Sequence, residues 1–238
     1  MKKYLLLVLL FIGIVAVSGC IGTTNSGSGH VINQTRNVSG FNQINLDDTG
    51  TLIITQGNTE SLTVEAEDNV MPQIKTQVSN NQLNININRA NVIPTKSVKY
   101  YLTVKNISSI NINGAGQIQS SKLNTSDLTI KINGAGQGNL TNLTANSLTL
   151  TIDGAGRMNI SGTTNNQTIN ISGVGEYVAD NLNSKTTSIT INGAGKATVR
   201  VSVLLNAVIN GAGQILYIGN PQVNQKINGT GNVKQTTG

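Results

Sequence analysis

A five-residue phrase, Ile-Asn-Gly-Ala-Gly, recurs along the second half of the chain at a nearly constant interval. Successive isoleucines of the phrase and its close variants are 20, 20, 19, 20, 18 and 18 residues apart. A regular period of this size is typical of a stacked repeat, in which one unit describes most of the fold. The copies occupy Ile112–Gly116, Ile132–Gly136, Ile152–Gly156, Ile171–Gly175, Ile191–Gly195, Ile209–Gly213 and Ile227–Gly231.

The residues before each glycine pair alternate strictly between apolar and polar, as in 128–133 and 148–153. Such alternation predicts short strands with one buried face. The period leaves no room for a long helix, and the Leu-x-x-Leu-x-Leu pattern of leucine-rich repeats is absent. We therefore predict an all-β fold, a parallel β-helix (solenoid) with turns of roughly 18–20 residues. Because parallel crossovers are nearly always right-handed, the coil is expected to be right-handed.

Stacking of the turns explains the residues of the phrase. Its isoleucines would form one inward column and the residues two positions earlier a second, with β-branched side chains suited to strands. Each Asn would lie at a corner and bond the Asn of the next turn. The glycines permit positive φ or close approach of neighbouring turns. The members of the second column are Ile130, Leu150, Ile169, Ile189 and Ala207.

A Gly-Ala-Gly turn could instead present backbone N–H groups to an anion. The phrase lacks the lysine of a phosphate loop and the following helix of a dinucleotide site. We therefore interpret the glycines as structural and predict no cofactor-binding residues.

The start of the chain has the pattern of an export signal. Lys2 and Lys3 precede an apolar run, and Val17-Ser-Gly-Cys20 resembles a lipoprotein box. We predict a signal peptide over 1–19 and a lipid on Cys20, the only cysteine. An uncleaved membrane anchor is the alternative, although the run is short for a spanning helix. The body would then be exported and anchored to the outer side of the cytoplasmic membrane or to the cell envelope.

Residues 20–36 are rich in Gly, Ser, Thr and Asn and are predicted to form a flexible tether, in which the lone His30 has no functional role. Residues 37–111 lack the period but keep strand patterns, so they are predicted to be an irregular β cap before the repeats of 112–238.

The acidic residues gather in this cap, where we interpret them as a solvated face. A cation site is the alternative. They are Asp47, Asp48, Glu60, Glu65, Glu67 and Asp68.

The charge and the aromatic content limit the classes of binding partner that the sequence favours. The formal net charge is +6, and +4 without Lys2 and Lys3, with the other cations scattered along the sequence. Aromatic residues make up 3% of the chain, which leaves no stacking platform for bases, so nucleic-acid binding is not expected. Surface glycans and acidic polymers of the envelope remain candidate partners, as does the membrane through the lipid. The sequence predicts no oligomeric state.

Three segments resemble the auto-transporter adhesin "head GIN" domain family of envelope proteins. They are the opening strand 37–44 (Asn-Val-Ser-Gly-Phe-Asn-Gln-Ile), the Gly-Ala-Gly turns, and the closing segment 214–221 (Gln-Ile-Leu-Tyr-Ile-Gly-Asn-Pro) with Gly229-Thr-Gly231. The resemblance runs from about residue 37 to the end. It implies a surface-exposed β-helix and supplies no catalytic residues.

Two classes of function follow. The first, which we favour, is a non-enzymatic surface module with a structural or adhesive role. The second is a polysaccharide lyase or hydrolase, which needs paired carboxylates or a metal site. The acids of the repeats (Asp127, Asp153, Glu176 and Asp180) fall at different places in the period. Glu176 and Asp180 would be ~13 Å apart along one strand, so no catalytic or metal-binding residues are predicted.

A third hypothesis rests on an outward column of hydroxyl residues, as in ice-binding solenoids. Threonine is also a common exposed strand residue, which explains the column equally well. The column comprises Thr129, Thr149, Thr168 and Ser188.

Overall fold

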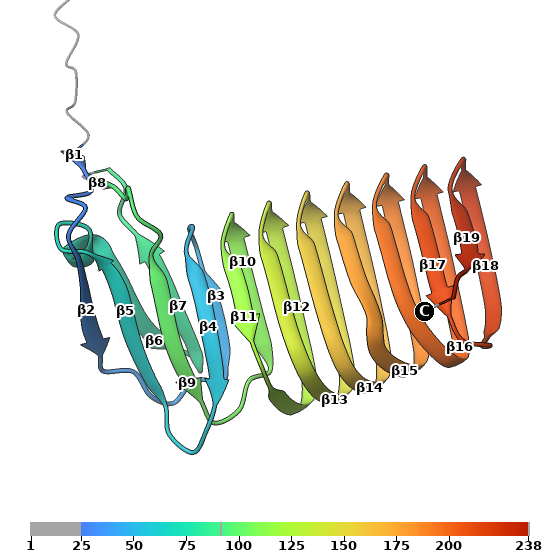
Figure 1. Ribbon diagram of the computed structural model, residues 1–238, viewed down its shortest axis with the longest axis horizontal. Helices are drawn as coiled ribbons and strands as arrows, with labels where there is room; N and C mark the ends of the chain where they lie inside the picture. The colour runs from blue at the N-terminus through green and yellow to red at the C-terminus, as the bar shows by residue number, and fades with distance from the viewer. Residues whose placement is uncertain (1–24, 91, 238) are drawn as a thin grey trace, which may run out of the picture.

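The computed structural model describes residues 25–90 and 92–237 and shows an elongated β-solenoid of about six turns with an irregular cap at its N-terminal end (Figure 1). One 17-stranded sheet winds through cap and coil. The described N-terminal residues lie at the cap, and the C-terminus lies at the opposite end of the rod. The predicted all-β stack of parallel coils is therefore confirmed.

Parallel pairing alone builds the coil beyond the cap. From β13 to β16 each period is a single long strand rather than several short ones. It ends at the glycine turn and pairs with the period before and the period after. The strands are β10 (Ser109–Gly114), β11 (Gln117–Ser120), β12 (Leu123–Gly134), β13 (Gln137–Gly154), β14 (Arg157–Gly173), β15 (Glu176–Gly193), β16 (Lys196–Gly211), β17 (Gln214–Ile218), β18 (Gln222–Gly229) and β19 (Asn232–Gln235).

The isoleucine of each repeat pairs with the isoleucine of the next, from Ile112 to Ile227. All members from Ile112 to Ile209 are 0% exposed, whereas Ile227 in the last turn is 37% exposed. The second column, from Ile130 to Ala207, is also in register and buried. Both predicted columns are confirmed, and together they form the centre of the hydrophobic core.

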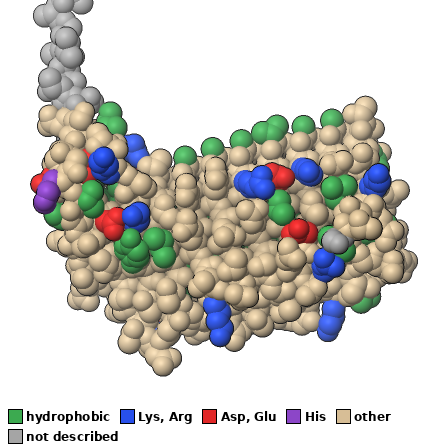
Figure 2. Space-filling view, viewed as in Figure 1, with side chains coloured by type: hydrophobic (Ala, Val, Ile, Leu, Met, Phe, Trp, Pro, Cys, Tyr) green, Lys and Arg blue, Asp and Glu red, His purple; other side chains and the backbone are tan. Residues whose placement is uncertain are grey.

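The two glycines of the repeat have different roles. The first has positive φ, as at Gly134 (φ 128°), where a Cβ would lie 2.6 Å from the Gly114 carbonyl oxygen. The second has ordinary φ, but a Cβ on Gly136 would lie 2.9 Å from the Ile132 side chain. The residue between them is exposed, and Figure 2 shows small hydrophobic side chains at regular intervals along one edge of the rod.

The asparagines that follow the isoleucines form the predicted ladder in two stretches. Asn133 Nδ2 donates to Asn113 Oδ1 (2.7 Å), and Asn228 and Asn210 continue a second run with bonds of 2.7 and 2.8 Å. The ladder is interrupted where Asp153 and Ser172 replace asparagine.

A buried polar cluster interrupts the core at a place that the repeat pattern does not indicate. Gln167 and Thr187 are buried in a column that holds Leu148 and Leu205 in the flanking turns. Tyr177 Oη donates to Gln167 Oε1, and Gln167 Nε2 donates to Ser184 Oγ, both at 2.9 Å. Burial raises the pKa of Tyr177. Because these side chains satisfy one another, the cluster avoids the cost of unpaired polar groups.

The cap combines parallel and antiparallel pairing. Its elements are β1 (Asn25–Ser26), β2 (Val31–Arg36), β3 (Gln43–Leu46), β4 (Thr51–Gln56), β5 (Ser61–Glu67), a 3-10 turn (Met71–Gln73), β6 (Ile74–Ser79), β7 (Gln82–Ile87), β8 (Val92–Ile93) and β9 (Lys99–Val104).

The stack begins earlier in the chain than the repeated phrase indicates. β3 pairs in parallel with β10 on one side and β7 on the other, and β4 pairs likewise with β11 and β9. Leu46 therefore pairs with Ile112 at the head of the isoleucine column. The boundary drawn before residue 112 is too late, because residues 43–56 already form one turn. The chain then builds β5–β9 before it returns as β10.

The tether predicted over residues 20–36 is also too long. β1 pairs with β8, and β2 pairs antiparallel with β5 from Val31↔Glu67 to Arg36↔Leu62. The segment from residue 25 onward is thus part of the cap. Its polar composition suits an edge strand whose outer side faces solvent.

Candidate functional site

The outward columns form a regular polar surface along the rod. Thr129, Thr149, Thr168 and Ser188 pair in sequence and continue as Asn206. The predicted hydroxyl column therefore exists, but it changes to an amide within the coil. Figure 2 shows Lys, Arg, Asp and Glu side chains scattered among mostly uncharged ones on the viewed face of the coil.

A groove of about 570 Å³ lies on the outer surface of the coil. Two neighbouring columns line it, and each runs through β13, β14, β15 and β16. The outer column is Thr144, Thr163, Asn183 and Arg200, and the inner column is Ala145, Thr164, Ser184 and Val201. The groove therefore runs parallel to the axis of the solenoid.

Changes in turn length shape this face. The register shifts between Asn159 and Gly162 and again between Ala179 and Asn183, so the corner beside the groove differs from one turn to the next. Gly219, at one end of the groove, has φ 109° and lies against the backbone of Val201. Positive φ and the absence of a Cβ let the chain approach the preceding turn closely here.

Two cations lie in the groove. Arg200 Nε donates to the carbonyl oxygen of Asp180 at 2.7 Å, a bond that orients the guanidinium group. Lys185 is exposed. Neither forms a salt bridge with any residue in the described part of the chain, and no acid lines the groove. The cations are scattered along the sequence, which therefore does not predict this pair; only the register brings positions 185 and 200 to one face.

The acids of the coil do not pair with one another across the ladder. Glu176 pairs in register with Arg157 and Lys196, and its carboxylate accepts from Arg157 Nη1 at 2.6 Å. Asp180 accepts from the neighbouring Asn181 side chain at 3.2 Å. Asp153 pairs with Asn133 and Ser172, and Asp127 pairs with Ser147. No carboxylate in the described coil thus has another carboxylate as its ladder partner.

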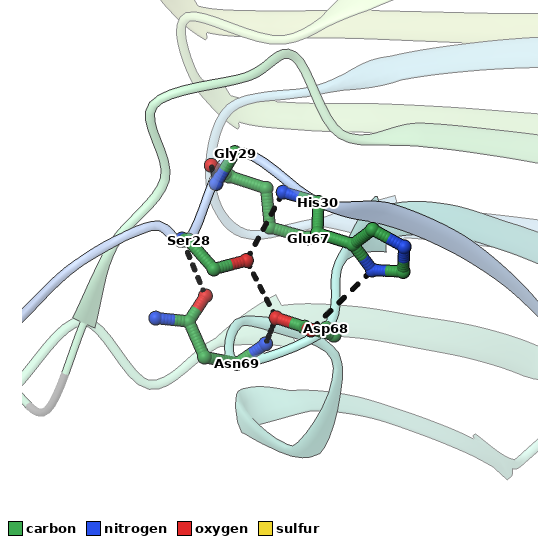
Figure 3. A network of polar contacts seen from close by, with 6 residues as sticks. All are labelled: Ser28, Gly29, His30, Glu67, Asp68 and Asn69. Atoms are coloured by element: carbon green, nitrogen blue, oxygen red, sulfur yellow. Dashed lines mark hydrogen bonds and ion pairs between the residues drawn. The ribbon is translucent and has the colours of Figure 1, made fainter.

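A polar network in the cap ties the first described residues to the end of β5 (Figure 3). Ser28 Oγ donates to Asp68 Oδ1 at 2.5 Å, and Ser28 N donates to Asn69 Oδ1 at 2.9 Å. His30 Nδ1 lies 3.4 Å from Asp68 Oδ2. No functional role was predicted for His30, and the structure places it in this contact with Asp68.

Glu67 is the buried centre of this region, with 1% of its surface exposed. Its carboxylate accepts from the backbone N–H groups of Gly29 (2.8 Å), Thr95 (2.8 Å) and Lys96 (3.2 Å), and from Thr95 Oγ1 at 2.5 Å. Burial alone would raise the pKa of Glu67, but these hydrogen bonds outweigh it and lower the pKa to about 2. The ionised carboxylate therefore joins two loops to β5.

The other cap acids are mostly engaged as well. Asp48 binds Arg89 at 2.6 Å, and Glu65 binds Lys99 at 2.7 Å. The hydrogen bond from Lys99 lowers the pKa of Glu65. The interpretation of the acids as a solvated face is therefore wrong for Glu67 and incomplete for these pairs. Within the described residues, no group of three or more His, Cys, Asp or Glu side chains could hold a metal ion.

The predicted signal peptide and Cys20 lie outside the described residues. Among the residues that are described, no helix has the length and apolar character needed to span a membrane.

Comparison with known proteins shows a matching family profile and several similar crystal structures. Residues 40–221 match the profile of a family described as "Putative auto-transporter adhesin, head GIN domain". This match confirms the resemblance drawn from the opening strand, the glycine turns and the closing segment. No curated protein matches the chain.

Several crystal structures share the architecture. A "putative adhesin" from Bacteroides fragilis has a TM-score of 0.83 and 26% identity, over 89% of this chain and 99% of that chain. A "putative adhesin" from Parabacteroides distasonis has a TM-score of 0.71 and 21% identity, over 90% and 100% of the two chains. A "putative lipid binding protein" from the same species has a TM-score of 0.70 and 20% identity, over 89% and 98%.

Proposed function

Because the chain belongs to the head GIN domain family of auto-transporter adhesins, we propose that it is a non-enzymatic, membrane-anchored module that binds polymers at the cell surface. The family's adhesin description and that of the B. fragilis structure support a surface location. The observation that carries the proposal is the form of the coil. It offers a polar lateral surface and an axial groove, while its carboxylates stand apart from one another.

A lipid on Cys20 would hold the cap near the membrane. Five residue steps separate Cys20 from Asn25, so this link spans at most about 18 Å. Asn25 begins β1 at the cap, and the network around Glu67 fixes the following residues there (Figure 3). The cap would thus be the membrane-proximal end of the rod, with the coil available to partners outside the cell.

We expect Cys20→Ser to abolish lipid attachment and to leave residues 1–19 uncut or to release the protein. The reason is that Cys20 supplies the thiol that the lipid modifies, after the Val17-Ser-Gly sequence that ends the signal. Membrane fractionation with intact-mass measurement of the wild type and the variant tests this. A variant that stays in the membrane with a processed N-terminus would contradict lipid anchoring.

We expect the full-length chain, purified in detergent, to bind one or more glycans on an array and to cleave none of them. The expectation rests on the absence of a carboxylate pair in register, together with the salt bridge that neutralises Glu176. Release of reducing ends or unsaturated products from the same glycans is measured alongside binding.

The alternative function is a polysaccharide lyase or hydrolase. The double variant Glu176→Gln, Asp180→Asn separates the two functions, because these are the closest acids in the sequence of the coil. If the wild type cleaves a glycan and the double variant does not, the protein is a polysaccharide lyase or hydrolase, and the proposed non-enzymatic binding function is wrong. Absence of both binding and cleavage on every glycan would leave the adhesive role without support.

A further inference from the structure

We propose that the groove through β13–β16 is a binding site for an extended acidic polysaccharide, with Arg200 and Lys185 as the residues that bind its anionic groups. This inference rests on the proposed function and specifies the class of polymer and the place where it binds. The observation that supports this inference is an axial groove that contains two cations without acidic partners.

The shape of the groove suits a linear polymer. Its lining comes from four successive strands and from Gly219 and Asn220 after β17, so it crosses five stacked turns. With strands spaced by ~4.8 Å, the lining extends over roughly 19 Å along the axis. A chain of sugars lying in it would meet side chains held by the backbone of each turn.

The polar groups differ between the two ends of the groove. The β13–β14 end offers neutral side chains, namely Thr144, Thr163 and Asn165, which can bond sugar hydroxyls. The β15–β16 end holds Lys185 and Arg200. The sugar chain would place its hydroxyls against the first end and a carboxylate or sulfate against the second.

The guanidinium of Arg200 is oriented before any ligand binds. Its Nε is occupied by the Asp180 carbonyl, and the structure shows no other side-chain bond from Arg200 within the described residues. The two Nη groups remain to form a paired hydrogen bond with an anion, the geometry in which arginine binds carboxylates most strongly. Arg157, Arg89 and Lys99 differ, because each binds a carboxylate of the protein itself.

The lining favours a polysaccharide over other polyanions. It contains no aromatic side chain, and single-stranded nucleic acids usually need aromatic rings for base stacking. The backbone of β13, β14 and β15 beside the groove is paired on both sides, and β16 pairs with β17 up to Arg200 and with β18 from Leu204. This leaves little free backbone for an acidic peptide to bind by adding a strand. Short hydroxyl and amide side chains match the hydroxyl-rich surface of a glycan.

The test compares the full-length chain with the double variant Lys185→Gln, Arg200→Gln. The probes are polygalacturonate, heparin, neutral dextran, poly-glutamate and oligo-dT. We expect wild-type binding to polygalacturonate or heparin that weakens as salt rises. The double variant should bind that probe about tenfold or more weakly, since it loses two charge-assisted contacts. The control Lys131→Gln, Lys226→Gln removes the same charge from exposed positions outside the groove and should change the Kd by less than about twofold.

The single variant Lys185→Gln guards against misfolding, because the Lys185 side chain is exposed and makes no hydrogen bond to the described residues. It should fold normally and still weaken binding. Equal affinity of the wild type and the double variant for the acidic polysaccharide would show that the groove is not the binding site. If the wild type binds dextran but neither acidic polysaccharide, the inference of an acidic ligand is wrong, while the proposed function stands. If it binds poly-glutamate or oligo-dT as tightly as the acidic polysaccharides, the assignment of the groove to glycans is wrong. No glycan binding at all would contradict the proposed function itself.

Discussion

Ile171→Asp is expected to lower the free energy of unfolding by about 4 kcal/mol or more and to unfold several turns together. Ile171 is 0% exposed and pairs with Ile152 below and Ile191 above. The substitution removes a branched aliphatic group from the column and places a carboxylate among hydrocarbon side chains. Because each turn packs on its two neighbours, the damage spreads along the stack. Urea denaturation followed by circular dichroism measures the loss.

The matched control is Thr190→Asp, one residue before the paired Ile191. Thr190 is on the outward side of the same ladder, between Asn170 and Val208. Its charge stays in water, so the expected cost is below about 1 kcal/mol. Similar losses in the two variants would mean that the inward and outward columns are wrongly assigned.

Gly134→Ala is expected to destabilise the protein by about 2–4 kcal/mol, although it adds only one methyl group. Gly134 has φ 128°, a region that alanine rarely adopts, and its Cβ would lie 2.6 Å from the Gly114 carbonyl oxygen. That oxygen also accepts the backbone bond from Ala135, so it cannot move away without loss. Thermal and urea unfolding of the variant measure the effect.

Ala135→Val supplies the comparison within the same turn. Ala135 is exposed, and the equivalent position two turns later is naturally Val174, which is 64% exposed. We expect a change of no more than about 0.5 kcal/mol. A larger loss from Ala135→Val than from Gly134→Ala would contradict the role assigned to the first glycine.

The repeated phrase was sufficient to predict the coil because its information is local and periodic. A constant interval places each isoleucine above the last, and strict alternation decides which side chains point inward. The glycine turns and the asparagine ladder follow from the same interval. For this reason the columns from Ile112 to Ile227 and from Ile130 to Ala207 could be written down from the sequence.

The cap could not be predicted in the same way, because its contacts join segments that no period relates. The stacking of residues 43–56 on β10 and β11 depends on the chain returning after β5–β9. The binding of Gly29 and Thr95 by Glu67 likewise joins loops far apart in the sequence. A polar segment looks the same in sequence whether it is a free tether or an edge strand such as β2.

The sequence by itself determined the all-β class, the parallel stack, the inward columns and the glycine corners, since each depends on a spacing that can be read along the chain. The tertiary structure alone decided the first turn of the stack, the buried cluster of Tyr177, Gln167 and Ser184, and the groove. The groove arises where unequal turns change the register, and that shift brings Lys185 and Arg200 onto one face. Such a placement depends on the path of several turns in space, which no single repeat encodes.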